Sequence, residues 1–187
     1  AQTGERNSLN DFFRGSLTDE NTGQPYIRVT DMKEGGVDLS DIKYVPKEVQ
    51  DSIKRYVISK DDLFITVAGT LGTVGRIPKE LDGANLTENA DKLTNIKISR
   101  DYLEFYLRSP RIQNEIQASQ TQNAQPKLAI ERIKKFKIFL PDRCEQEEIV
   151  EVLNTWVNAI DSLEEFLKQK QKQKKALMQR LLTGKHR

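Results

Sequence analysis

The stretch that decides the fold is residues 141–187, PDRCEQEEIVEVLNTWVNAIDSLEEFLKQKQKQKKALMQRLLTGKHR. It has no proline after Pro141 and no glycine before Gly184, so one helix can run through it unbroken. Apolar residues recur at alternating steps of four and three, the 3.5-residue period of a coiled-coil seam. Two lysines, Lys170 and Lys174, interrupt this seam, and so narrow a stripe needs a partner helix. The residues predicted to mediate dimerisation are Ile149, Leu153, Trp156, Ile160, Leu163, Leu167, Leu177 and Leu181.

Charge is divided along the same stretch. From Glu145 to Glu165 there are seven acids and no Lys or Arg, and from Phe166 onward there are eight bases and no acid. The helix dipole explains part of this pattern, but its effect fades beyond the terminal turns. Pairing explains the rest, because two antiparallel copies would set each acidic half along a basic half. We therefore expect an antiparallel helix pair, in which some 38 helical residues would separate the attached domains by roughly 55 Å.

Length and composition limit the remaining possibilities. The 187 residues suffice for one α/β domain over 1–140 and the helix over 141–187, so we expect an α+β protein ending in a long coiled-coil helix. A net charge of +2 does not by itself indicate nucleic-acid binding. One cysteine and one histidine exclude an internal disulfide and a zinc cluster, and no metal is expected. No apolar run approaches the ~20 residues of a membrane span, so we expect a soluble, cytoplasmic protein.

The rest of the chain reads as short elements. Strands are expected at Gln24–Thr30, Asp38–Val45, Leu63–Ala68, Leu93–Ile98 and, closing the domain, Phe136–Leu140. One or two helical turns are expected at Lys47–Tyr56. Ser99 or Asp101 can cap a helix that the Ser109-Pro110 pair breaks or restarts.

A glycine series, Gly69, Gly72 and Gly75, follows the best strand candidate. Its G-x-x-G-x-x-G spacing is not that of a dinucleotide or Walker loop, and a second strand follows where those loops have a helix. The simpler interpretation is a tight hairpin that needs positive φ angles. The functional alternative is a hairpin tip near a nucleic-acid backbone, where Thr70, Thr73 and Arg76 would contact phosphates.

Other polar groups are candidates for the same chemistry. The amides of Gln120 to Gln125 can pair with an adenine edge, although such clusters are often only solvated loops. Asp31 and Lys33, and the loop residues Asn89, Asp91 and Lys92, are weak candidates alone. The group Lys134, Lys135 and Lys137 fits either a DNA backbone contact or a charged solvent face, and we favour the solvent face.

No catalytic constellation is present. A nucleophile–histidine pair would need His186 in the tail, and neither a methyltransferase motif nor a cofactor glycine loop occurs. We therefore predict a protein that is not an enzyme by itself. A protein–protein adaptor without DNA specificity is the alternative, and an unrecognised metal-dependent nuclease is a third possibility.

Several motifs together resemble the specificity subunits of type I restriction–modification systems. The tail from Lys174 to Arg187 is similar to their carboxyl end, and Leu140-Pro141 followed by Glu145–Ile149 is similar to the entry of their spacer helix. Pro25–Val29, the run from Ile65 to Arg76, and Gln122–Gln125 fit their target-recognition domain.

The resemblance implies a non-catalytic subunit whose recognition domain reads one half of a split site in double-stranded DNA. Its helix would space the half-sites and dock methyltransferase subunits, and S-adenosylmethionine, ATP and Mg would be bound only by partners. Family members usually carry two recognition domains, so this chain is either a half-length subunit that forms a homodimer or half of a longer chain. The candidate DNA-binding residues are Arg28, Asp31, Lys33, Thr70, Thr73, Arg76, Asn89, Lys92, Gln120, Gln122, Asn123, Gln125 and Lys127.

Overall fold

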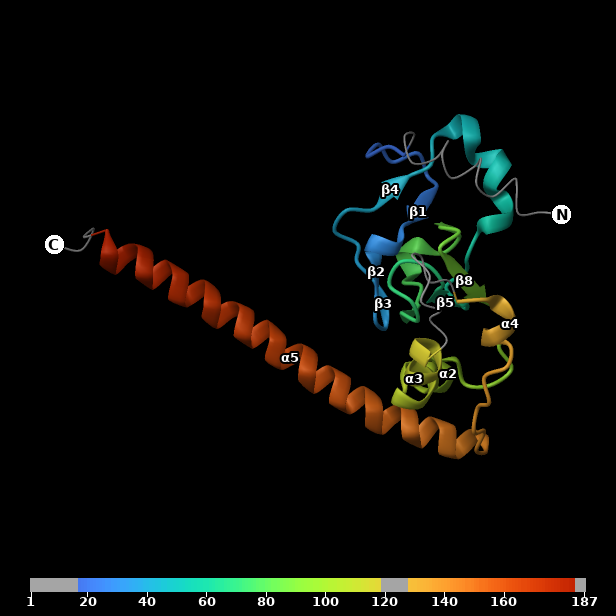
Figure 1. The fold of residues 1–187 in the computed structure, drawn as a ribbon. Coiled ribbons are helices and arrows are strands. Elements are labelled where there is room, and N and C mark those ends of the chain that lie inside the picture. The colour runs from blue at the N-terminus through green and yellow to red at the C-terminus, as the bar shows by residue number, and fades with distance from the viewer. Residues whose placement is uncertain (1–16, 119–127, 184–187) are drawn as a thin grey trace. The chain divides into compact units, whose positions relative to one another are not determined.

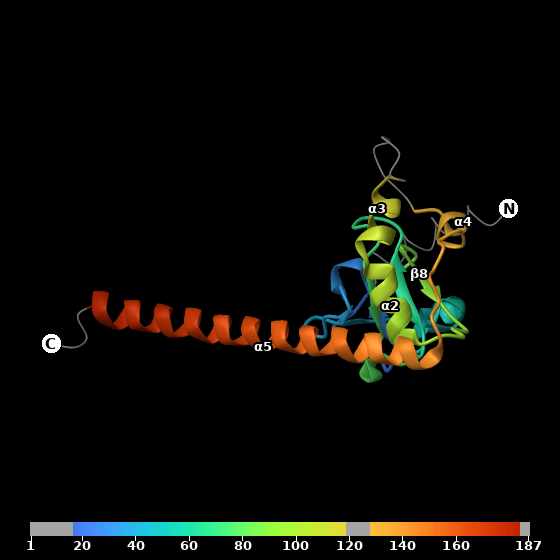
Figure 2. The same ribbon diagram turned by 90° about the horizontal axis from the view of Figure 1, so that it is seen from below.

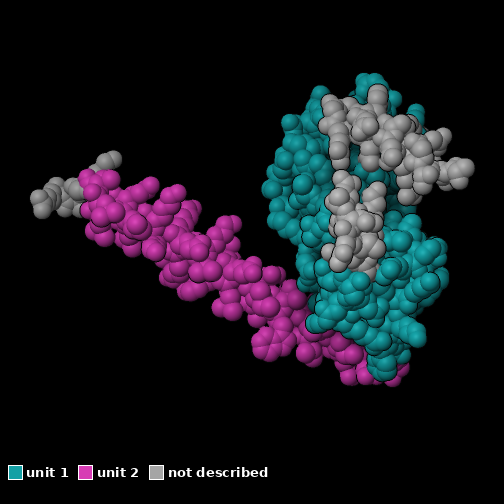
Figure 3. Space-filling view, viewed as in Figure 1, with its two compact units in different colours: residues 1–140 teal, residues 141–187 magenta. Residues whose placement is uncertain are grey.

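The structure, a computed structural model, describes residues 17–118 and 128–183. The chain divides into two compact units, residues 1–140 and 141–187, which are coloured separately in Figure 3. Unit 1 combines small sheets with short helices, and unit 2 contains one long helix (Figure 1). The expected α+β class is therefore confirmed. In the part of the chain that the structure describes, the helices are too short or too polar to cross a membrane.

The central sheet of unit 1 is antiparallel and has the strand order β6-β5-β8. All four residues of its middle strand, Leu-Phe-Ile-Thr, are buried, so both faces of the strand are covered. The predicted hairpin is confirmed, since β5 and β6 pair with Phe64 opposite Gly75. The three strands are β5 (Leu63–Thr66), β6 (Val74–Arg76) and β8 (Ala90–Leu93).

Shorter strands and turns of 3-10 helix surround this sheet. The strand order β4-β1-β7 contains an antiparallel pair and a parallel pair, and β2 and β3 form a separate hairpin. The strands are β1 (Pro25–Ile27), β2 (Met32–Lys33), β3 (Gly36–Val37), β4 (Lys43–Tyr44) and β7 (Asn85–Leu86). The 3-10 helices are η1 (Val29–Asp31), η2 (Lys47–Tyr56) and η3 (Lys79–Leu81), and η2 lies where helical turns were predicted.

Two helices, α2 (Arg100–Arg108) and α3 (Pro110–Ala118), follow one another directly and contact each other (Figures 1 and 2). The Ser99 hydroxyl caps α2 by accepting the Tyr102 N–H at 3.3 Å, as predicted. The predicted break at Ser109-Pro110 is also confirmed. A short third helix, α4 (Ile130–Ile133), follows the next described segment.

The two faces of β5 contribute to different hydrophobic clusters. Leu63 and Ile65 pack in one cluster with apolar residues of α2 and α3, including Leu107 and Ile112. Phe64 points into another cluster that contains Ile27. All six of these side chains are at most 2% exposed, so β5 joins both halves of the core of unit 1.

Gly75 lies where β6 approaches the β2–β3 hairpin closely. A Cβ atom there would lie 2.5 Å from the backbone nitrogen of Gly36 and 2.6 Å from Phe64 Cζ. The Gly35 N–H donates to the Val74 carbonyl at 2.9 Å, which ties the β2–β3 hairpin to β6. Only glycine fits at this crossing without displacement of the backbone.

Two predicted strands are wrong. Leu93–Ile98 does not extend as a strand, because β8 ends at Leu93 and Asn95 adopts a positive φ of 54°. Residues 136–140 pair with no strand of the described chain. Hydroxyl groups from α2 hold this segment instead, and the Tyr102 hydroxyl donates to the Phe139 carbonyl at 2.7 Å. The strands predicted at Gln24–Thr30 and Asp38–Val45 are shorter than expected.

Unit 2 consists of α5 (Arg143–Leu182), a single helix of 40 residues. The Asp142 carboxylate caps its start by accepting the Glu145 N–H at 3.0 Å. Most seam side chains are open to solvent, with exposed fractions of 67% for Trp156 and 72% for Leu181. Ile149 and Leu153, near the start of the helix, are half-buried. The predicted long helix is confirmed, and its apolar stripe is largely uncovered.

Candidate nucleic-acid interface

Three loops of unit 1 meet along one edge. The Asn89 carbonyl accepts the N–H groups of Val67 at 2.7 Å and Ala68 at 3.2 Å, which joins the β7–β8 loop to the base of the hairpin tip. A Cβ on Gly69 would lie 3.7 Å from Val29 Cγ1, so the tip also adjoins the start of η1. We call this edge the recognition rim and define it as residues 28–30, 67–73 and 87–89.

A buried hydroxyl shapes the hairpin tip. Thr66 is 1% exposed, and its Oγ1 donates to the Thr70 carbonyl and accepts the Thr73 N–H at 2.9 Å. Gly69 and Gly72 have φ angles of 79° and 82°, as the predicted tight turn requires. The turn therefore has a fixed backbone, while the Thr70 side chain is exposed and the Thr73 side chain is half-buried.

A polar hollow of about 450 Å³ opens beside the rim. It brings together cations, carboxylates, an amide and hydroxyl groups, which are the groups that hydrogen-bond base edges and sugars. Both loops that contain Arg28 and Asn89 contribute to it. The lining residues are Leu17, Asp19, Tyr26, Arg28, Val29, Thr30, Lys43, Thr87, Glu88 and Asn89.

The guanidinium of Arg28 is held by carboxylates of the same chain. Its Nε and Nη2 donate to both oxygens of Asp31, at 2.9 and 2.6 Å, and Nη2 also donates to the Asp41 carbonyl oxygen at 2.7 Å. The hydrogen bond with Asp31 raises the pKa of Arg28 above its ordinary value. Asp31 is only 5% exposed, so this pair closes the η1 turn.

Arg76 belongs to a buried ionic network that the sequence did not reveal. Its Nε lies 2.6 Å from an oxygen of Glu104, which is fully buried, and its Nη1 lies 3.3 Å from Asp101. Arg108 reaches Glu104 at 3.0 Å and Glu34 at 3.1 Å. Burial raises the pKa of the Glu104 carboxyl above its ordinary value of 4.5. The sequence signal was a carboxylate beside the inward-facing Leu103 and one turn before Arg108.

The other described candidates occupy varied surroundings. Lys33 and Lys92 are exposed; Lys33 donates to Asp38, and Lys92 donates to the Val57 carbonyl at 2.7 Å. The hydrogen bond from Lys33 lowers the pKa of Asp38 to about 2. Asn89 is half-buried on the rim. Five candidates lie outside the described residues: Gln120, Gln122, Asn123, Gln125 and Lys127.

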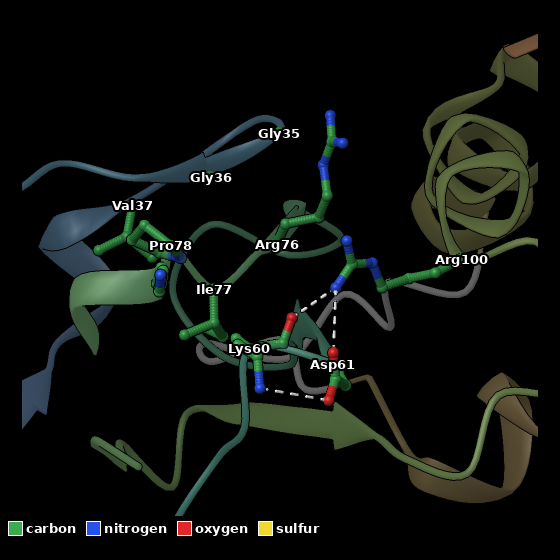
Figure 4. Close-up of a pocket in the computed structure, with 10 residues that line it drawn as sticks. Gly35, Gly36, Val37, Lys60, Asp61, Arg76, Ile77, Pro78 and Arg100 are labelled. Carbon is green, nitrogen blue, oxygen red and sulfur yellow. Dashed lines mark hydrogen bonds and ion pairs between the residues drawn. The ribbon is translucent and has the colours of Figure 1, made fainter. Parts of the chain in front are cut away.

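A second hollow, of about 500 Å³, is lined by Gly35, Gly36 and several cations (Figure 4). Three of its four cations, Lys60, Arg76 and Arg100, lie near acids, and Lys79 has no ion-pair partner among the described residues. Lys60 lies 3.6 Å from Asp61 and 3.4 Å from Asp82, and Arg100 lies 3.6 Å from Asp101. Because most of its cations are paired, this hollow attracts a polyanion less than a set of unpaired cations would.

Comparison with known proteins identifies the family. The model of the type I restriction modification DNA specificity domain matches residues 9–173, most of the chain, and the chain belongs to this family. The family is that of the specificity component, which is itself non-catalytic and binds no cofactor.

Two specificity subunits are similar to this chain in sequence. The subunit of the type I restriction enzyme EcoBI from Escherichia coli is 28% identical over 144 residues, or 76% of this chain and 30% of that protein. The subunit of EcoKI from Escherichia coli strain K12 is 28% identical over 149 residues, or 76% and 32%. The chain thus spans about a third of the length of these relatives.

Two solved structures share the fold. One chain, from work on the assembly and conformational transition of a type I R-M system, has a TM-score of 0.66 at 20% identity, covering 89% of this chain and 45% of that one. The HsdS subunit from Thermoanaerobacter tengcongensis has a TM-score of 0.63 at 19% identity, covering 88% and 44%.

Proposed function

We propose that this chain is the DNA-recognition component of a type I restriction–modification enzyme, and that unit 1 reads one half of a bipartite site. The observation that carries the proposal is the family match over residues 9–173, which includes parts of both units. The methyltransferase and nuclease activities, with S-adenosylmethionine, ATP and Mg, would belong to partner subunits. The complex would act on double-stranded DNA in the cytoplasm.

Within unit 1 we assign base and backbone contact to the recognition rim. The exposed hydroxyl of Thr70 and the amide of Asn89 are side chains that can bond a phosphate or a base edge. Thr73, Lys33 and Lys92 remain candidates for contact.

We give three charged candidates a positioning role. Releasing Arg28 would leave the buried Asp31 without this partner, and releasing Arg76 would leave the buried Glu104 with one arginine instead of two. These ion pairs therefore favour a role in shaping the rim over direct contact of the two arginines with DNA.

We propose that α5 pairs with a second spacer helix in antiparallel orientation. The exposed apolar seam supports pairing, and the separation of acidic and basic halves supports the orientation. A helix of 40 residues is about 60 Å long at 1.5 Å per residue. That length exceeds the ~34 Å of one DNA turn, so the helix is long enough to separate two domains that contact half-sites at least one turn apart.

Selection of bound sites from random DNA tests the recognition role. The chain is assembled with the methyltransferase subunits of its own system, and bound duplexes are recovered and sequenced. We expect one enriched half-site, repeated as an interrupted palindrome if two copies assemble. Assembly without enrichment would favour the adaptor alternative, and metal-dependent cleavage by the chain alone would indicate a nuclease.

The orientation of the helix pair can be measured with spin labels. Cys144 is the single cysteine, is exposed, and lies at the start of α5. In an antiparallel pair the two labels would lie about 55 Å apart, whereas in a parallel pair they would lie near the ~10 Å interaxial distance. If Lys170 and Lys174 fix the orientation, replacing both with leucine adds a second distance to the distribution.

A further inference from the structure

The recognition rim itself provides few cations that are free to bind phosphate. The guanidinium of Arg28 is bound to Asp31 and Asp41, and Lys43 in the adjoining hollow is bound to Asp19 and Asp41. A DNA duplex that approaches the rim carries one negative charge per ~1.7 Å of its axis. Other cations must bind these phosphates, and unpaired ones on the neighbouring surface of unit 1 are suited to do so.

Residues 132–137, RIKKFK, contain four cations and no acid. Arg132, Lys135 and Lys137 are exposed, and none of them has an ion-pair partner among the described residues. Lys134 is already paired with Glu131 at 3.0 Å. The first three side chains can therefore bind phosphates without breaking an existing ion pair, unlike Arg28 or Arg76.

Tyr106 connects this segment with a further cation on α3. Its hydroxyl accepts a hydrogen bond from Arg111 Nη1 at 3.3 Å and lies 3.5 Å from the Lys137 carbonyl oxygen. Arg111 is exposed, and Glu115 lies one turn further along α3. We call Arg111, Arg132, Lys135 and Lys137 the basic strip.

The strip is close to the recognition rim along the backbone. The Leu128 N–H donates to the carbonyl of Val67, a rim residue, at 2.9 Å. Arg132 is four residues from Leu128, so their Cα atoms can be at most about 14 Å apart. Lys137, nine residues from Leu128, is at most about 32 Å from it. Both ends of residues 132–137 therefore fall within the ~34 Å of one turn of duplex from Leu128.

The geometry points to the basic strip as a DNA-backbone contact, which binds phosphates of the same duplex that the recognition rim reads. This inference rests on the proposed function. It replaces the interpretation favoured from the sequence, in which Lys134, Lys135 and Lys137 form only a charged solvent face. An acidic surface of a protein partner is the competing occupant, and the exposed Phe139 and Leu140 would suit it. The paired cations of the rim favour DNA, because otherwise the rim would face phosphates with few counter-charges.

A double variant, Lys135→Gln with Lys137→Gln, tests the assignment in the chain assembled with its methyltransferase subunits. The matched control is Lys47→Gln with Lys79→Gln, which removes two other exposed lysines that have no ion-pair partner among the described residues. The measurement is DNA affinity as a function of salt. Each lost phosphate contact reduces the slope of log affinity against log salt by about 0.9, so the strip variant should be shallower by about 1.8.

Over a fourfold rise in salt, the strip variant should lose about 12-fold less affinity than the unmodified complex, on random and selected DNA alike. The control should keep the original slope. An unchanged slope in the strip variant, or an equal change in the control, would overturn the assignment. Failure of the strip variant, but not of the control, to assemble with the methyltransferase subunits would also overturn the assignment and would mark the strip as a protein contact. If the unmodified complex binds no DNA, the proposed function fails as well.

Discussion

Unit 1 buries its apolar side chains and pairs its buried charge internally, whereas unit 2 leaves most of its apolar side chains exposed. In unit 1 the strand β5 is covered on both faces, and even a carboxylate at 0% exposure, Glu104, has two arginines of the same unit beside it. Of the fourteen large hydrophobic side chains that are exposed in the described chain, ten lie on α5. Unit 1 is organised to be stable alone, and unit 2 is organised to be covered.

The difference separates two kinds of mutational effect. A change in the core of unit 1 acts on folding whatever the chain is bound to. A change on the seam of α5 acts on association and leaves unit 1 intact.

The largest effect is expected from Phe64→Ala. Removing a fully buried aromatic ring from β5 should lower the free energy of unfolding of unit 1 by about 3–5 kcal/mol. Urea unfolding measures the loss, and Ile65→Val, at about 0.5–1.5 kcal/mol, serves if the larger change prevents folding. Leu167→Ala on the exposed seam should leave the unfolding of unit 1 unchanged. A shift of unit 1 by Leu167→Ala would break the comparison.

Leu163→Asp should weaken pairing of α5 strongly. Placing a carboxylate in a buried seam should cost about 2 kcal/mol or more of association, at least ~30-fold in the dissociation constant. Sedimentation across a concentration series measures it. The control Asn158→Asp adds the same charge off the seam and should have little effect. A helix pair that survives Leu163→Asp would refute the seam assignment.

Gly75→Ala should destabilise unit 1 by about 1–3 kcal/mol, because the added methyl group meets the Gly36 backbone and the Phe64 ring. Gly36→Ala is the matched control, since a Cβ at Gly36 has no neighbour within 4 Å. Thermal unfolding of both variants gives the comparison. Equal destabilisation by the two would mean that loss of backbone flexibility, and not close approach, sets the effect.

A smaller effect concerns pH. Because the pKa of Glu104 is raised in the folded chain, the folded state binds more protons than the unfolded state in the window from about pH 4.5 up to the raised value. The free energy of unfolding should therefore fall as pH rises through that window and stay level above it, as far as Glu104 contributes. Urea unfolding at a series of pH values should show this slope removed in Glu104→Gln and retained in Glu115→Gln. Loss of the slope in both variants would contradict the assignment.

Local patterns predicted the elements that depend on local sequence. The period of α5, the Ser99 cap and the hairpin with positive φ at Gly69 and Gly72 followed directly from residue type and spacing. The alternation at residues 136–140 was also real, since Phe136 and Ile138 are more buried than Lys137 and Phe139. Alternation alone does not provide a partner strand, and the tyrosines of α2 hold this segment instead.

Contacts between distant segments were beyond local patterns. The parallel pairing of β1 with β7 joins residues about sixty positions apart, and nothing in either dipeptide specifies it. Likewise, Arg76 was predicted to contact phosphate because its hairpin could be recognised from the local sequence. Its carboxylate partners lie on α2, and the local sequence does not show that they are near Arg76. Of the candidate interface, the hairpin tip and the Asn89 loop were predicted as separate features, and the structure brings them to one edge.

The hydrogen bonds of the Thr66 hydroxyl affect which substitutions the hairpin can accept during evolution. It secures the turn through the Thr70 carbonyl and the Thr73 N–H, groups that every residue type except proline carries. The side chain at Thr70 takes no part in that arrangement, so many residues can occupy this position on an unaltered backbone. The hairpin backbone can therefore keep its conformation while residue 70 changes, and under the proposed function such substitutions would alter DNA preference without cost to the fold.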